Sequence, residues 1–196
     1  MSGTEGYATE APALLKQYEA LDFATVHRRI LHLLPALPAH VLDIGAGTGR
    51  DAAALAALGH GVVAVEPTTE LRAQAALLHP SPAITWVDDS LPELAAVTGR
   101  FALVLLTAVW MHLDAAQRAR AMPRVAALVA PGGSLAMTLR HGPVPPGRRM
   151  FDVRAPETME LAAAAGLGLT LLLEDEVGAE TRPGITWTRL AFTRPA

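Results

Sequence analysis

The sequence contains no cysteine, which excludes disulfide bonds, thiolate metal sites and a cysteine nucleophile. Charged residues make up only 18% of the chain and the formal net charge is −3, so the overall charge does not draw the chain to nucleic acid or to an acidic membrane. No apolar run approaches the roughly 18 residues that a membrane-spanning helix needs. We therefore expect neither a nucleic acid nor a membrane as a partner.

The first residues also lack the basic and apolar regions of a secretory signal peptide, so a cytoplasmic location is the default expectation. A length of 196 residues favours one domain, residues 1–196, as a monomer or a homodimer. Hydrophobic residues make up 51% of the chain, which is ample material for a buried core.

The chain does contain a regular alternation of short apolar runs and longer helical patterns. Strands are predicted at residues 41–44, 61–66, 83–87, 101–106, 134–139, 167–174 and 185–192, and helices at 50–58, 70–78, 115–129 and 156–165. The strand runs are continuously hydrophobic, which is typical of parallel strands covered on both faces. The pattern predicts an α/β, doubly wound fold: a mostly parallel seven-stranded sheet with helices on both faces.

The two ends of the chain depart from this alternation. Residues 175–184, rich in charge, glycine and proline, predict no crossover helix, so the last strand is expected to be antiparallel in a terminal hairpin at or near the sheet edge. Residues 1–38 predict one or two helices and a partial lid. Ligands of open α/β sheets bind at the carboxyl ends of the strands, so functional residues are sought there.

A glycine turn follows the first predicted strand. Gly45, Gly47 and Gly49 there permit positive φ and a close approach of ligand to backbone, as in nucleotide-binding turns. The spacing G-x-G-x-G differs from the dinucleotide pattern G-x-G-x-x-G, and Asp43 would repel a pyrophosphate but suits an ammonium. Glu66 ends the next strand, where it can accept hydrogen bonds from ribose hydroxyls. The alternative is a tight turn with an unrelated charge.

Together these features resemble the class I S-adenosylmethionine-dependent methyltransferases, over about residues 41–139. The resemblance implies S-adenosylmethionine as the cofactor. Pro131, Gly132 and Gly133 before the fifth strand are a further feature of the family. The cofactor-binding residues it implies are Asp43, Gly45, Ala46, Gly47 and Gly49 in the first motif, Glu66 and Pro67 at the ribose, Asp88, Asp89 and Ser90 at the adenine, and Thr107 and Ala108 at the methionine part. For residues 88–90 the alternative is a solvated turn that caps a short helix containing Glu93.

The loop after the fourth strand faces the acceptor in this family. His112 is a candidate general base, because its reference pKa of about 6.5 lies near neutral pH; the alternative is a structural histidine. Met111 stands where the family often has glutamate, so no metal site or carboxylate-assisted catalysis is carried over. Trp110 is a candidate acceptor contact or a core residue. The loop lacks the N-P-P-Y pattern of enzymes that methylate exocyclic amines or glutamine.

The loop at residues 140–154 concentrates basic residues at the carboxyl end of the fifth strand. Arginine recognises carboxylates and phosphates through paired donors, so we expect a substrate-side loop in which Arg140 and His141 bind an anionic acceptor. The alternative is a solvated loop whose arginines pair with surface acids, which is the favoured interpretation of Arg148 and Arg149. Tyr7 or Tyr18 would contact the acceptor from the amino-terminal lid.

The sequence thus predicts methyl transfer from S-adenosylmethionine to a small-molecule acceptor, with an anionic acceptor as one hypothesis. Direct displacement requires mainly positioning and desolvation, so neither a triad nor a metal site is expected. Asp51 is interpreted as a first-turn helix acid. The alternatives are an NAD-dependent oxidoreductase, a non-catalytic partner subunit on the same fold, and other chemistry on S-adenosylmethionine.

Overall fold

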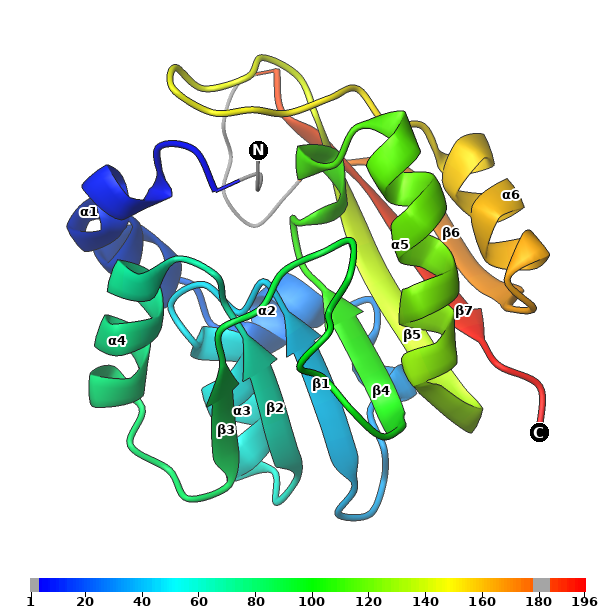
Figure 1. Ribbon diagram of the computed structural model, residues 1–196, viewed down its shortest axis with the longest axis horizontal. Coiled ribbons are helices and arrows are strands. Elements are labelled where there is room, and N and C mark those ends of the chain that lie inside the picture. Colours follow the sequence, from blue (N-terminus) through cyan, green and yellow to red (C-terminus); the bar gives the residue numbers. More distant parts are fainter. Residues whose placement is uncertain (1–3, 178–183) are drawn as a thin grey trace.

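The computed structural model describes residues 4–177 and 184–196. Within these residues, seven strands form one sheet in the order β3-β2-β1-β4-β5-β7-β6 (Figure 1). The strands are β1 His40–Ile44, β2 Gly61–Val65, β3 Ile84–Val87, β4 Phe101–Leu106, β5 Val129–His141, β6 Gly168–Glu176 and β7 Thr186–Thr193. Strands β1 to β5 are parallel, and β7 is antiparallel to both β5 and β6. The predicted mostly parallel sheet with an antiparallel last strand is confirmed.

Helices cover both faces of the sheet, as predicted. They are α1 Tyr7–Glu19, α2 Phe23–His27, α3 Arg50–Ala57, α4 Thr69–Leu78, α5 Ala115–Leu128 and α6 Ala155–Ala164, with short 3-10 turns η1 Leu31–Leu33 and η2 Trp110–His112. Consecutive strand residues point to opposite faces: Leu103 packs with Leu55 of α3, and Val104 packs with Met122 of α5. This two-sided burial explains why the strands are continuously hydrophobic.

Two connections differ from the prediction. Strand β5 begins at Val129 and passes through residues 131–133, where its register with β4 shifts. A Cβ on Gly133 would lie 3.0 Å from the carbonyl oxygens of Phe101 and Ala102, so glycine permits this close approach of β5 to β4. The short helix weighed around Glu93 is a turn instead, because β3 and β4 are joined without a helix.

The carboxyl ends of β1 to β5 lie along one edge of the sheet, and α1 and the loop after β5 lie above that edge (Figure 1). Since β7 is antiparallel, its amino end reaches the same edge. Residues 1–3 of the predicted lid and residues 178–183 of the predicted hairpin connection lie outside the described residues. In the part of the chain that is described, no helix has the length and apolarity to cross a membrane.

Candidate active site

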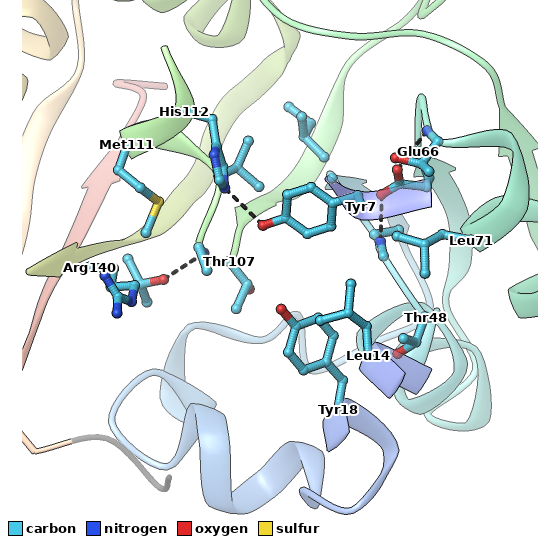
Figure 2. Close-up of a pocket in the computed structure, with 18 of the residues that line it drawn as sticks. Tyr7, Leu14, Tyr18, Thr48, Glu66, Leu71, Thr107, Met111, His112 and Arg140 are labelled. Carbon is cyan, nitrogen blue, oxygen red and sulfur yellow. Dashed lines mark hydrogen bonds between the residues drawn. The ribbon is translucent and has the colours of Figure 1, made fainter. Parts of the chain in front are cut away.

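A cavity of about 330 Å³ opens at this edge, a size suited to a small ligand. Its walls come from α1, from the ends of the strands and from the loop after β5, and Figure 2 shows the side chains of α1 reaching into it. Carboxylates from β1, β2 and the segment after β3 line one end of the cavity. Arginines from β5, β7 and the loop after β5 line the other.

The glycine turn between β1 and α3 forms part of the first end. Gly45, Gly47 and Gly49 have φ of 72°, 57° and 86°, in the left-handed region that favours glycine. A Cβ on Gly45 would lie 2.5 Å from a methyl carbon of Val109. Gly45 and Gly47 line the cavity together with Ala46, whereas Gly49 precedes the first residue of α3, behind the cavity wall.

Asp43 lies at the base of this end and is only 1% exposed. Asp43 is part of the cavity wall, and its buried Oδ2 has no hydrogen-bond partner among the described residues. Burial raises the pKa of Asp43, and the nearby carboxylate of Asp51 raises it further. A buried carboxylate without a partner is costly, so this position calls for a cationic ligand group.

Two further carboxylates are held on the same wall by backbone donors. Glu66 accepts hydrogen bonds from the backbone N–H of Gly47, at 2.9 Å, and of Thr68, at 2.8 Å, and burial raises its pKa. Asp89 accepts from the backbone N–H of Ser90, at 2.8 Å, and of Ala96, at 2.7 Å. A carboxylate oxygen can accept a second hydrogen bond, so both acids keep capacity for a ligand. Pro67 and Ser90 line the cavity beside them.

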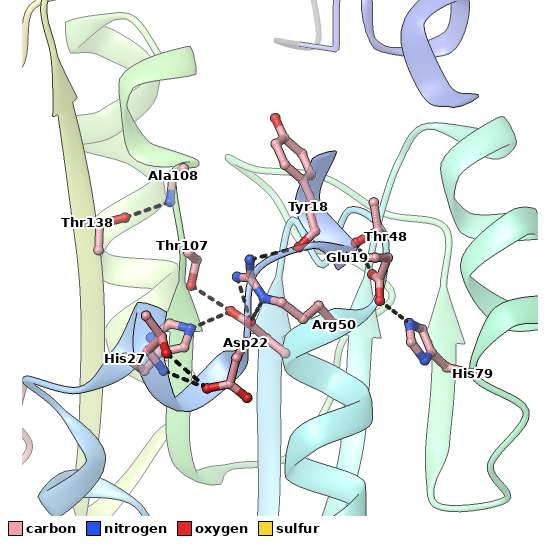
Figure 3. A network of polar contacts seen from close by, with 12 residues as sticks. Tyr18, Glu19, Asp22, His27, Thr48, Arg50, His79, Thr107, Ala108 and Thr138 are labelled. Atoms are coloured by element: carbon pink, nitrogen blue, oxygen red, sulfur yellow. Dashed lines mark hydrogen bonds and ion pairs between the residues drawn. The ribbon is translucent and has the colours of Figure 1, made fainter. Parts of the chain in front are cut away.

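Asp51 connects three elements at the cavity wall, where the side chains of His27, Arg50 and Thr107 converge (Figure 3). Its carboxylate lies 2.7 Å from Nε2 of His27 and 2.7 Å from Nη2 of Arg50, and it accepts a hydrogen bond from the hydroxyl of Thr107 at 3.1 Å. Burial alone would raise the pKa of Asp51, but His27 and Arg50 together lower it. Asp51 is therefore more than a first-turn helix acid: it joins α2, α3 and the end of β4.

His112 of η2 is fixed at both ring nitrogens. Nδ1 lies 2.8 Å from the carbonyl oxygen of Arg149, and Nε2 lies 3.0 Å from the Tyr7 hydroxyl (Figure 2). Because a carbonyl only accepts, Nδ1 carries the hydrogen of the neutral ring, and Nε2 accepts from Tyr7. Burial lowers the pKa of His112, with Arg148 and Arg140 contributing, which favours this neutral form.

The amino-terminal helix and the loop after β5 are joined above His112. The guanidinium of Arg148 lies 3.6 Å from the ring centre of Tyr7 and pairs with Glu10 of α1. The Arg148 side chain is only 4% exposed, so its predicted solvated position is corrected. Arg149 pairs with Asp114 at 2.9 Å, as expected for an arginine held by an acid.

Beside the predicted Arg140, the second end of the cavity contains three residues that the sequence did not single out. Thr138 and Arg140 of β5 and Trp187 and Arg189 of β7 all line the cavity. Thr138 accepts a hydrogen bond from the backbone N–H of Ala108, at 2.8 Å, and so ties β5 to the loop after β4. Arg189 was missed because functional residues were sought at the carboxyl ends of the strands, whereas it is the amino end of β7 that reaches this edge.

Comparison with known proteins identifies the type of domain. A family model described as a methyltransferase domain matches residues 41–133. An uncharacterised methyltransferase of Mycobacterium tuberculosis is 38% identical over 113 residues, a match that covers 54% of this chain and 41% of that protein. Residues 41–133 therefore match a methyltransferase domain, and the seven-stranded sheet has the class I S-adenosylmethionine-dependent methyltransferase fold. The chain spans less than half the length of the curated relatives that it matches.

Solved methyltransferase structures share the fold over nearly the whole chain. A TehB-like S-adenosylmethionine-dependent methyltransferase from Corynebacterium glutamicum has a TM-score of 0.75 at 20% identity, covering 95% of this chain and 98% of that one. The 1,6-didemethyltoxoflavin-N1-methyltransferase of Burkholderia thailandensis, solved with 1,6-didemethyltoxoflavin and S-adenosylhomocysteine, has a TM-score of 0.70 at 22% identity, covering 97% and 86%.

Four of the predicted site residues lie outside the cavity: Gly49, as described above, and Asp88, Trp110 and His141. Asp88 is exposed and pairs with Arg72 at 2.7 Å, so of the two neighbouring aspartates only Asp89 lines the wall. His141 follows Arg140 on β5 and therefore points to the opposite face, where its Nε2 lies 2.9 Å from the hydroxyl of Thr188. Trp110 is fully buried in the hydrophobic core. None of these residues is part of the cavity wall, and Trp110 takes the core position that the sequence left open as an alternative.

Proposed function

We propose that this domain binds S-adenosylmethionine at the carboxylate end of the cavity and transfers its methyl group to a small-molecule acceptor at the arginine end. The observation that carries the proposal is the buried Oδ2 of Asp43, which lines the cavity without a hydrogen-bond partner among the described residues. The ammonium of S-adenosylmethionine is the kind of group that would complete this site.

The remaining carboxylates fit other parts of the same cofactor. Glu66 would accept hydrogen bonds from the ribose hydroxyls, and Asp89 would accept from the adenine amine, with Leu91 against the ring. Thr107 and Ala108, at the end of β4, would contact the methionine part. Ala108 has a φ of 58°, and such a conformation in a non-glycine residue is typical of functional sites.

When bound, S-adenosylmethionine supplies an electrophilic methyl group on a positively charged sulfur. The residues of this chain then have to position the acceptor and exclude water. We propose that residues 4–38 and 140–154 form the lid of a single domain over the acceptor. His112 is neutral and offers a lone pair at Nε2, so it takes the acceptor's proton there once the Tyr7 hydroxyl no longer occupies that nitrogen.

The charge of the cavity supports an anionic acceptor. Arg140 lines the end opposite Asp43, beside the Tyr7 and Tyr18 side chains that enter from α1 (Figure 2). The Burkholderia thailandensis enzyme, bound to 1,6-didemethyltoxoflavin, supports a small molecule rather than a macromolecule as the acceptor.

Calorimetric titration of the full chain with S-adenosylhomocysteine and with NADH tests the proposal. We expect micromolar binding of the first and none of the second. Acceptors are then screened by release of S-adenosylhomocysteine, with methylthioadenosine as the product of other chemistry on the same cofactor. Binding of NADH alone would overturn the proposal in favour of an oxidoreductase. Cofactor binding without either product, across carboxylate and phosphate acceptors, would favour a partner subunit.

A further inference from the structure

Arg189, a residue of the cavity wall, has a side-chain donor without a partner among the described residues. It lies on β7 opposite Thr138 of β5, and its side chain is only 7% exposed. Its Nε donates a hydrogen bond to Oε2 of Glu176 at 2.8 Å, but its Nη1 is buried and has no partner among the described residues. Buried arginine nitrogens normally have acceptors, so an acceptor is missing from this place.

The positive charge around Arg189 is only partly balanced. The carboxylate of Glu176 is shared, because its other oxygen accepts a hydrogen bond from Arg29 at 2.9 Å. Burial lowers the pKa of Arg189, and Arg28 and Arg29 add to this effect while Glu176 opposes it. One carboxylate among several guanidinium groups leaves an environment that favours a further anion.

The neighbouring cavity residues extend this environment. Arg140 of β5 pairs in register with Trp187, two residues before Arg189 on β7, so the two arginines and the indole line the same part of the cavity. Arg140 donates a hydrogen bond from Nη2 to the carbonyl oxygen of Pro143 at 2.9 Å, which holds its guanidinium over the cavity. Trp187 offers an apolar surface beside the two charges.

We propose that Arg189, together with Arg140, binds a carboxylate or phosphate of the acceptor, with the Trp187 ring against the acceptor's apolar body. This inference rests on the proposed function and makes Arg189 a specificity-determining residue. Paired guanidinium donors match the geometry of an oxyanion. A neutral acceptor of the same shape would leave Nη1 buried without a partner, and it is selected against for that reason.

The test uses the full chain saturated with S-adenosylhomocysteine, titrated with benzoate, phenyl phosphate and benzamide. Binding is followed by calorimetry and by tryptophan fluorescence, to which Trp187 contributes. We expect the anions to bind at least about tenfold more tightly than neutral benzamide, as befits a charge-assisted hydrogen bond. Whichever of benzoate and phenyl phosphate binds more tightly shows whether the site prefers a carboxylate or a phosphate.

Variants assign the effect to Arg189. Arg189→Met should weaken benzoate binding about tenfold or more, and Glu176→Gln should strengthen it severalfold by removing the competing carboxylate. Arg154→Met is the matched control, because Arg154 is 81% exposed and lies outside the cavity. A purely structural Arg189–Glu176 pair would not give effects of opposite sign. If circular dichroism shows that Arg189→Met does not fold, the proposal is tested with Glu176→Gln and Arg189→Lys instead. Arg189→Lys is expected to weaken benzoate binding.

The outcomes separate the two proposals. Equal binding of benzoate and benzamide, no binding of either anion, or an unchanged affinity in Glu176→Gln overturns the anion site and leaves cofactor binding intact. Failure of S-adenosylhomocysteine to bind the wild-type chain overturns the proposed function itself.

Discussion

The two ends of the cavity are built in different ways. At the carboxylate end, Asp43, Glu66 and Asp89 follow or end neighbouring parallel strands, and backbone N–H groups orient the latter two. At the arginine end, Arg140 and Arg189 come from antiparallel strands far apart in the sequence. The arginines there are held largely by side chains of other elements, such as Glu10 for Arg148 and Glu176 for Arg189.

This difference fits a separate function for each end of the cavity. Backbone donors fix a carboxylate wherever the main chain is fixed, so the first end is shaped before any ligand arrives. Side-chain ion pairs exchange partners more readily, so the second end can vary between related proteins while the sheet stays the same. The comparison predicts that changes at one end affect the cofactor and changes at the other affect the acceptor.

The largest effect is expected at Asp51, on which both ends depend. Asp51→Asn removes the charge that balances His27 and Arg50 in a buried site, so the free energy of unfolding should fall by about 3–5 kcal/mol. Urea unfolding followed by circular dichroism measures it. The control is the exposed Glu70→Gln in α4, for which we expect no more than about 0.5 kcal/mol. A similar loss in both variants would mean that Asp51 does not join the elements.

Asp43→Asn should weaken ligand binding at the carboxylate end and leave the arginine end unchanged. Losing one charge-assisted partner predicts a drop of about 10- to 100-fold in S-adenosylhomocysteine affinity, while Arg189→Met leaves that affinity unchanged. The affinity should also depend on pH, because the pKa of Asp43 is raised and an ammonium binds the carboxylate form. The affinity of the wild-type chain for S-adenosylhomocysteine therefore falls as the pH drops through that pKa. Calorimetry across pH should find a flatter dependence in the variant. Equal losses in the two variants would contradict the division between the ends.

The same contrast explains what the sequence predicts. The sheet follows from continuous apolar runs, and Asp43, Gly45 and Glu66 follow from a local motif whose geometry is set by a single strand–turn–helix unit. Arg189 could not be found this way, because its place depends on the insertion of β7 between β5 and β6. His141 was expected beside Arg140 in the cavity, but successive residues of a strand point to opposite faces of the sheet, so only Arg140 lines the cavity. For Trp110 the sequence left an acceptor contact and a core position open, because burial depends on tertiary packing and not on the loop that carries the residue.

His112 should give a smaller effect that appears only in acid. Its pKa is lowered by burial, so between the folded-state pKa and about 6.5 the unfolded chain binds more protons, and stability falls as the pH drops through this window. Above about 6.5 this contribution is fully present. Chemical unfolding of His112→Gln at several pH values should show a shallower loss than wild type. The exposed His32→Gln serves as the control and should follow the wild-type profile.

The smallest effect is expected at Asp88, and it tests how closely the carboxylate end is defined. Asp88 is exposed and pairs with Arg72, whereas Asp89 lines the cavity and accepts two backbone hydrogen bonds. Asp88→Asn should therefore change S-adenosylhomocysteine affinity by less than about twofold, and Asp89→Asn by about tenfold. Calorimetry on both variants, with their unfolding midpoints as a check on folding, measures the difference. If Asp88→Asn weakens binding more, the segment after β3 must rearrange when ligand binds, and the carboxylate end would be no more preformed than the arginine end.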